Sequence, residues 1–457
     1  MSTVPARTSF LSRSLLHYPS NNRRIGYLAI SVLATIILYY ESYVLSSVAP
    51  LVQAQFKLSL TTYVYIIVLA NLLGAVSSLL GGLSDRLGRA NLVIYGLLLT
   101  GVVTVAISFT SVTPLFLGLY WILGFVEGII LVATPALVRD FSPRLGRATA
   151  MGFWTVGPVG GSVLATLVAN QTLPVYNNSW QSQYLIAGIV GLVVFFVCFF
   201  LLRELSPELR GQVMVSLREK ELVEERASTV HTAEAMRHSW RQMVRPVTIF
   251  SAIGISVFLL IYYAAVAFFP LYLTSVFKFT LAQANGMVGV FWLVNVVAAI
   301  VIGLISDRTV VRKPYMLGGT IATIIVTLLF ISRIGQPTSA TLMTVFLALF
   351  GITIAIAYVT WMASYTETIE NINPALVATG LAVWGSILRV VVVVSTLGLP
   401  IVVGNGQGWG AWWWVCIAGM VVFVPTIFLN AGYWSPAKAR TENRERAERL
   451  DIEPTAG

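Results

Sequence analysis

Long apolar runs constrain this chain more than any other feature of its sequence. Most are long enough to cross a hydrocarbon core of about 30 Å as helices. In lipid, only helices and closed barrels satisfy every backbone polar group, and these runs lack the alternation of barrel strands. The sequence therefore predicts an all-α membrane protein with twelve transmembrane helices, at residues 25–50, 61–83, 90–110, 114–138, 148–169, 183–202, 246–272, 284–305, 314–333, 340–364, 375–403 and 409–432.

The charged residues support this class and give it an orientation. Only 11% of the residues are charged, against about a quarter in soluble domains, which excludes a soluble enzyme. With both termini in the cytoplasm, the outer loops hold only Lys57, Lys278 and Arg333 among the basic residues, as the positive-inside rule requires. This accounts for the net charge of +10, so we expect a multi-pass protein of the cell membrane and no nucleic-acid partner. With 2 cysteines and 3 histidines, we expect no metal site and no cofactor.

The two halves of the chain repeat at a nearly constant offset of about 222 residues. The repeat predicts two pseudo-symmetric six-helix bundles, at 25–202 and 246–432, with a substrate site at their interface near mid-membrane. A cytoplasmic segment (1–24), a cytoplasmic connector (203–245) and a cytoplasmic tail (433–457) complete the chain. The matching pairs are Tyr39-Tyr40 with Tyr262-Tyr263, Pro50 with Pro270, Lys57 with Lys278, and Ser84-Asp85-Arg86 with Ser306-Asp307-Arg308.

Two elements between predicted helices carry a resemblance to a known family. Residues 81–89, Gly-Gly-Leu-Ser-Asp-Arg-Leu-Gly-Arg, resemble the G-x-x-x-D-R-x-G-R signature of the major facilitator superfamily. Residues 135–147 resemble an element of its sugar porters, with Asp140 in place of Glu. The resemblance implies the twelve-helix fold of secondary transporters, although the second copy of the signature lacks its glycine. Paired charges at helix ends can latch one face of such a bundle, and we expect this role for Asp85, Arg86, Gly88, Arg89, Asp140, Arg147, Asp307 and Arg308.

A third element lies in the fifth predicted helix and points to a gating pivot. Gly157-Pro158-Val159-Gly160-Gly161 resembles the G-P-x-x-G-G element of facilitator antiporters. Glycines allow a neighbouring helix to approach closely, and a proline kinks its helix. We expect Gly157, Pro158 and Gly161 to act in gating. The arginine that efflux members carry in the fourth helix is absent, which weakens an interpretation as a drug exporter.

Glu41, Glu127 and Arg389 are the only charged residues deep in the predicted helices. A charge at mid-membrane costs at least about 2.5–3.5 kcal/mol, so such residues usually have a function. We expect Glu41 and Glu127 to carry protons, because burial moves a carboxyl group toward protonation near neutral pH. Tyr39-Tyr40-Glu41 is also similar to the aromatic–acid patch in helix 1 of proton-coupled sugar facilitators. Alternatively, Glu41 pairs permanently with Arg389.

The guanidinium group of Arg389 suits a carboxylate, so we expect it to bind an anionic substrate, unless it pairs with Glu41 or Glu127. Further polar and aromatic residues are candidates for the wall of the substrate cavity. Each of them is also typical of simple helix packing. They are Tyr39, Tyr40, Tyr262, Tyr263, Tyr358, Trp361, Trp384, Asn285 and Asn295.

These observations predict a proton-coupled symporter that takes up a small organic solute, with a carboxylated metabolite preferred because of Arg389. The alternative is a proton antiporter that exports a drug-like or amphipathic compound. The sequence shows no nucleophile–base pair, metal-ligand cluster or phosphate-binding motif, so we do not expect an enzyme. The expected partners are the solute, protons and the lipid bilayer, and the oligomeric state is unknown.

Overall fold

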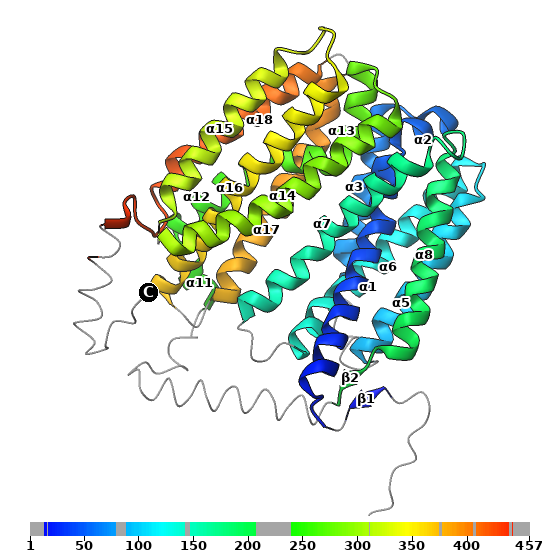
Figure 1. Ribbon diagram of the computed structural model, residues 1–457, viewed down its shortest axis with the longest axis horizontal. Coiled ribbons are helices and arrows are strands. Elements are labelled where there is room, and N and C mark those ends of the chain that lie inside the picture. Colours follow the sequence, from blue (N-terminus) through cyan, green and yellow to red (C-terminus); the bar gives the residue numbers. More distant parts are fainter. Residues whose placement is uncertain are drawn as a thin grey trace, which may run out of the picture. The chain divides into compact units, whose positions relative to one another are not determined.

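The computed structural model describes residues 13–15, 17–78, 88–141, 147–206, 239–309, 311–373, 377–404, 408–437 and 441. The chain divides into two compact units, Met1–Thr229 (unit 1) and Val230–Gly457 (unit 2). Helices dominate both units, as Figure 1 shows. The connector predicted at 203–245 lies mostly outside the described residues.

Unit 1 consists of helices and one minimal sheet. The helix that corresponds to the first predicted span is interrupted at Val48, so that α2 follows α1 directly. Strands β1 and β2 pair in parallel, two residues each. The elements are β1 (Ser14–Leu15), α1 (Asn21–Ser47), α2 (Ala49–Phe56), α3 (Leu60–Ser78), α5 (Arg89–Ser108), α6 (Thr113–Asp140), α7 (Arg147–Thr172), α8 (Trp180–Leu201) and β2 (Glu204–Leu205).

Unit 2 repeats this plan. Its first long helix is also interrupted, but at Leu259, which is about 11 residues earlier than the repeat offset would place the equivalent of Val48. Its elements are α11 (Ser239–Met243), α12 (Pro246–Phe258), α13 (Leu260–Phe277), α14 (Leu281–Thr309), α15 (Lys313–Ile331), α16 (Ala340–Ile372), α17 (Val377–Val403) and α18 (Trp409–Ile427).

The helices match the predicted spans closely. Among the described residues, 11 helices are long and apolar enough to cross a membrane, with α12 and α13 forming one of them. The fifth predicted span, 148–169, corresponds to α7, which has 26 residues but is not among the 11. The prediction of an all-α membrane fold is confirmed, and the expected number of helices is reached when α7 is included.

The internal repeat extends to the backbone conformation. Lys57 ends α2 and Lys278 ends α13, and both adopt the left-handed conformation, with φ of 51° and 60°. Such a conformation is uncommon for residues other than glycine and typical of helix C-caps. Two lysines at equivalent positions therefore end equivalent helices in the same way.

Glycines at equivalent positions allow close helix packing in both units. In unit 1, a Cβ at Gly128 of α6 would collide with the backbone of Gly74 in α3. In unit 2, a Cβ at Gly351 of α16 would lie 2.6 Å from the carbonyl oxygen of Phe291 in α14. Packing between lipid-embedded helices depends on such close approach. In each of the equivalent helix pairs α3–α6 and α14–α16, a glycine thus lies at the point of closest approach.

Candidate functional site

The carboxyl group of Glu41 lies in the interior of unit 1. The residue is on α1 and is completely buried. A Cβ at Gly191 of α8 would collide with Oε1, and the Thr100 hydroxyl of α5 lies nearby but donates to the carbonyl oxygen of Leu97. Neither carboxyl oxygen has a hydrogen-bond partner among the described residues. An ionised carboxylate without a partner is costly in this position, and the proton-carrying role expected for Glu41 remains a prediction.

Glu127 lies close to Glu41 in the same unit. It is on α6, which packs against α1, and its side chain is 7% exposed. The two carboxyl groups are within electrostatic range of each other, and the Ser42 side chain, beside Glu41 on α1, lies near the Glu127 carboxyl group. Two like charges in a low-dielectric interior repel each other. The structure therefore brings together the two acids that the sequence selected.

Arg389 lies in unit 2, on α17. Its side chain is exposed, and within the described residues it forms no ion pair. Val390 and Val394 on the same helix are also exposed. A guanidinium group that has no carboxylate partner in the described part of the chain can bind an anionic ligand, and the substrate-binding role remains a prediction.

The predicted aromatic residues of unit 2 form two groups. Trp361 is fully buried, and its indole N–H donates to the Ser251 hydroxyl at 2.9 Å. Its ring centroid lies 5.3 Å from that of Trp384 and 6.3 Å from that of Tyr358. In the second group, Tyr262 packs against Tyr263 and Trp292, with centroids 5.5 Å and 5.1 Å apart. Trp361 is fully buried, whereas Tyr358 and Trp384 are only partly buried, and a substrate contact remains a prediction for all three.

The predicted polar residues of helix α14 are engaged within the protein. Asn285 donates to the carbonyl oxygen of Leu281 in its own helix at 3.0 Å. Asn295 donates to the carbonyl oxygen of Gly351 at 2.9 Å and thereby joins α14 to α16. Both side chains are buried. These bonds support the packing interpretation that the sequence also allowed.

The two predicted tyrosines of α1 differ in their surroundings. Tyr40 is 2% exposed, and its hydroxyl has no hydrogen-bond partner among the described residues. Tyr39 is partly buried, with its ring centroid 5.6 Å from that of Tyr43. The backbone of Tyr39 lies so close to Gly161 of α7 that a Cβ there would be 2.5 Å from the Tyr39 Cβ. The predicted pivot glycine therefore lies directly against the helix that carries Glu41.

An ion pair joins two of the predicted latch residues in unit 1. Arg89 begins α5, and its guanidinium group lies 2.7 Å from Oδ1 of Asp140, the last residue of α6. Glu204 of β2 adds a second acid, because its Oε2 accepts the backbone N–H of Arg89 at 2.7 Å. A carboxylate at a helix N-terminus is favourable for the helix dipole. Gly88, with φ of 92°, leaves room for this carboxylate.

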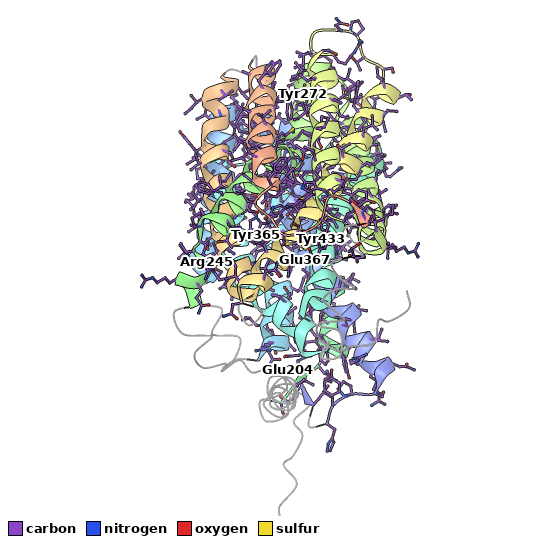
Figure 2. All side chains as sticks on the ribbon, turned by 90° about the vertical axis from the view of Figure 1, so that its left-hand side faces the viewer. Glu204, Arg245, Tyr272, Tyr365, Glu367 and Tyr433 are labelled. Carbon is purple, nitrogen blue, oxygen red and sulfur yellow. The ribbon has the colours of Figure 1, made fainter. Side chains whose placement is uncertain are left out.

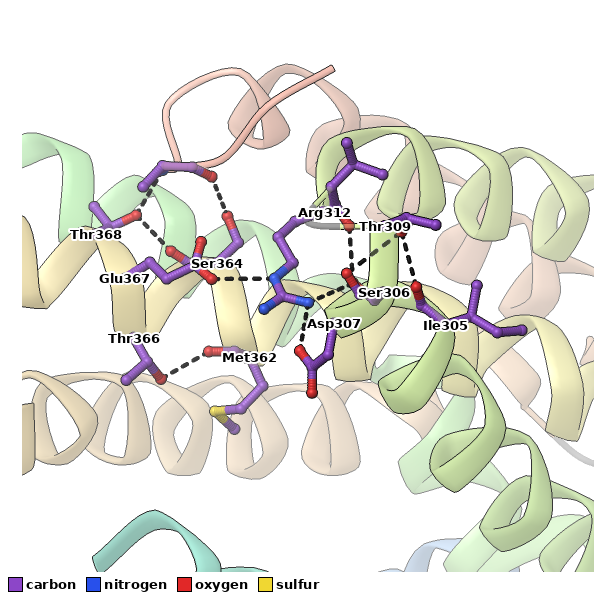
Figure 3. Close-up of polar contacts among 12 residues, drawn as sticks. Ile305, Ser306, Asp307, Thr309, Arg312, Met362, Ser364, Thr366, Glu367 and Thr368 are labelled. Atoms are coloured by element: carbon purple, nitrogen blue, oxygen red, sulfur yellow. Dashed lines mark hydrogen bonds and ion pairs between the residues drawn. The ribbon is translucent and has the colours of Figure 1, made fainter. Parts of the chain in front are cut away.

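Unit 2 has an equivalent charge cluster around Arg312, shown in Figure 3. The guanidinium group lies 2.8 Å from Oδ1 of Asp307 and 3.1 Å from Oε1 of Glu367, and it donates to the Ser306 hydroxyl at 2.7 Å. Figure 2 shows Glu367 at the end of unit 2 opposite Tyr272. Arg312 and Glu367 follow Arg89 and Asp140 by 223 and 227 residues. The cluster therefore repeats the ion pair of unit 1.

Sequence reasoning missed Arg312 and Glu204 as partners in these clusters. Arg308, predicted instead, is exposed, whereas Asp307 takes part as an exposed acid. The repeat offset was the signal that could have identified Arg312. Asp85 and Arg86 lie outside the described residues, and the side chain of Arg147 also lies outside them.

The glycines of α7 pack against α1. A Cβ at Gly157 would collide with the side chain of Thr35, and one at Gly160 would lie 3.0 Å from Cγ1 of Ile36. Pro158 lies inside the helix. These contacts give the element a physical role in the approach of two helices.

The long apolar helices, the duplicated six-helix plan and the paired charges at helix ends define a class: helical membrane transporters. Comparison with known proteins gives the family. The sequence profile of the Major Facilitator Superfamily matches residues 31–396, and the chain belongs to this family. The resemblance of residues 81–89 to the signature of this family is therefore confirmed. Membership in the family indicates a transporter and not an enzyme.

Individual relatives differ in what they transport. The chain is 22% identical to a phosphoglycerate transporter protein of Salmonella typhimurium over 367 residues, 78% of each chain. It is 28% identical to the multidrug efflux pump LfrA of Mycolicibacterium smegmatis over 162 residues, 35% of this chain and only 32% of the pump. Its fold is similar to the crystal structure of a D-xylose-proton symporter, with a TM-score of 0.66 at 14% identity, covering 90% of this chain and 97% of the other.

Proposed function

We propose that this protein is a proton-coupled symporter that carries a small organic anion, most simply a carboxylated metabolite, into the cell by alternating access. In this proposal the protein lies in the cell membrane with both termini in the cytoplasm. Glu41 carries the coupled proton, and Arg389 binds the carboxylate of the solute.

The burial of Glu41 is the observation that carries the proposal. Its carboxyl group is enclosed by α1, α5 and α8 with no ion-pair or hydrogen-bond partner among the described residues. A residue kept only for structure would be paired, because an unpaired buried charge is destabilising. Glu127 lies within electrostatic range and provides a second proton-binding group. Protonation of one acid is then sensitive to the other.

The preference for an anionic solute depends on Arg389. An exposed guanidinium group on a membrane-spanning helix is costly unless it serves a ligand or a water-filled path. The phosphoglycerate transporter, a relative over most of this chain, is named for an anion that carries a carboxylate. That relation supports the same class of solute here.

A second candidate function is proton antiport with export of an amphipathic compound. It is supported by the close packing of Gly157, Gly160 and Gly161 in α7 against α1, in an element similar to one in antiporters. The partial match to an efflux pump points in the same direction. The two candidates differ in the direction of solute movement relative to protons.

Transport by the purified protein in liposomes separates the candidates. We would measure uptake of phosphoglycerate, xylose and ethidium, which are an anion, a neutral sugar and an amphipathic cation. Accumulation of phosphoglycerate driven by inward proton flow is the expected result. Accumulation of ethidium driven by outward proton flow would support antiport instead.

The variant Glu41→Gln tests the proton carrier. We expect it to lose proton-driven accumulation but to retain exchange of labelled for unlabelled solute, because glutamine resembles the protonated acid. Glu127→Gln, compared in the same assay, shows whether the second acid is also required. Unchanged proton-driven accumulation in Glu41→Gln would overturn the proposed role of this residue.

A further inference from the structure

A short segment before α1 is attached to the end of α8 in unit 1. Strand β1 (Ser14–Leu15) pairs with β2 (Glu204–Leu205) through two backbone bonds. The N–H of Glu204 donates to the carbonyl oxygen of Arg13 at 3.1 Å, and the N–H of Ser206 donates to that of Leu15 at 3.0 Å. The segment therefore adds a strand to the residues that carry Glu204.

Arg13 anchors this segment in an unusual way. Its side chain is only 4% exposed, although arginine is rarely buried without a partner. Its guanidinium group donates to the carbonyl oxygen of Phe199 in the last turn of α8 and lies 4.4 Å from the centroid of the Phe199 ring. A cation is favourable at a helix C-terminus and over an aromatic face. Arg13 thus binds the end of α8 in two ways.

The same segment reaches the ion pair at the end of α6. The hydroxyl of Tyr18 donates to the backbone carbonyl of Asp140 at 3.3 Å. Asp140 pairs with Arg89, whose backbone N–H is bound by Glu204. Arg13 and Tyr18 therefore contact the two acidic residues that hold the beginning of α5.

We infer that residues 13–15 and 17–20, anchored by Arg13 on α8, position Glu204 at the N-terminus of α5 and so form part of the latch at this end of unit 1. This inference builds on the latch role expected for Arg89 and Asp140, which form an ion pair, and it does not depend on the proposed symport. Arg13 is a positioning residue, because it acts on α5 through β2 and Glu204. Releasing the segment removes the strand partner of Glu204 and loosens the beginning of α5.

Hydrogen exchange of the full-length protein tests this inference without any transported solute. In Arg13→Ala, we expect faster exchange at the amides of Glu204 and Ser206 and also at those of Arg89 and Ala90. The expected increase is about tenfold or more, the factor that follows from losing one hydrogen bond to a charged group. Unchanged exchange at Arg89 and Ala90 would overturn the inference.

Three further variants make the test specific. Arg23→Ala removes an exposed arginine in the first turn of α1 and should leave all four amides unchanged. Arg13→Lys keeps the charge and should fall between Arg13→Ala and the unmodified protein. Glu204→Gln keeps the strand pairing, so exchange should increase at α5 but not at Ser206. If Arg13→Ala does not fold, Arg13→Lys and Glu204→Gln still test the inference. Exchange rates at Arg89 and Ala90 that are the same in these two variants as in the unmodified protein would refute it.

Alkylation of a native cysteine gives a second readout. Cys198 is buried on α8, one residue before Phe199, and lies within electrostatic range of Arg13. In a Cys416→Ser background, maleimide should label Cys198 faster in Arg13→Ala than in Arg23→Ala. Because neither readout requires transport, the inference and the proposed symport can fail independently.

Discussion

Replacing Gly161 by alanine tests the close approach of α7 and α1, on which the predicted pivot depends. An added Cβ would lie 2.5 Å from the Cβ of Tyr39 and 2.8 Å from the carbonyl carbon of Tyr39 and the backbone nitrogen of Tyr40. Ordinary contacts of a Cβ begin near 3.4 Å. The atoms in conflict belong mainly to the backbone and cannot rotate away, so the two helices must separate by several tenths of an ångström.

The energetic cost follows from this geometry. Overpacking that forces a backbone shift costs about 1–3 kcal/mol. For a unit of this size, each kcal/mol lowers the melting temperature by about 2–4 °C, so we expect Gly161→Ala to melt about 2–12 °C lower. Gly157→Ala should cost less, because its conflict is with the side chain of Thr35, which can adjust. Both variants should also slow transport if the α1–α7 contact is the pivot.

Thermal unfolding of the purified protein in detergent provides the measurement. Gly118→Ala in α6 is the matched control, because a Cβ there meets nothing within 4 Å. This control should be neutral or stabilised by up to about 1 kcal/mol, since alanine favours a helix more than glycine does. Equal melting temperatures for Gly161→Ala and Gly118→Ala would show that the α1–α7 contact is not tightly packed.

Three further substitutions examine the charges. Arg312→Ala should destabilise the protein by about 1–2 kcal/mol, because it removes two ion pairs whose acidic side chains are partly exposed to solvent. As a control, Arg241→Ala removes an exposed arginine and should not lower the melting temperature. Arg389→Lys should weaken phosphoglycerate binding about tenfold in a direct binding assay, because lysine cannot form the bidentate contact that arginine forms with a carboxylate. Unchanged affinity would count against that contact. Gly191→Ala should displace the Glu41 carboxyl group and reduce proton-driven uptake, and normal coupling in this variant would contradict the tight enclosure of Glu41.

The candidate site was predictable where its chemistry depends on residue type alone. Glu41 and Glu127 were identified because a carboxyl group within a long apolar run is costly and therefore informative. The sequence could not show that Glu41 faces Gly191 of α8 or that Asn295 bonds to Gly351 of α16, because these contacts join residues far apart in the chain. The direction in which each side chain points depends on how the helices rotate against their neighbours.

The long apolar runs alone were sufficient to determine the helical membrane fold, because lipid leaves the backbone few alternatives. The residue pairs that recur at a nearly constant offset indicated its duplication. The repeat paired Lys57 with Lys278, and the structure shows that each of them ends a helix in the left-handed conformation. Only the tertiary structure revealed the attachment of Arg13 to Phe199 and the binding of Arg312 to Glu367. Each of these contacts joins two residues far apart in the sequence, which come together only when the helices pack. A local sequence pattern therefore cannot predict them.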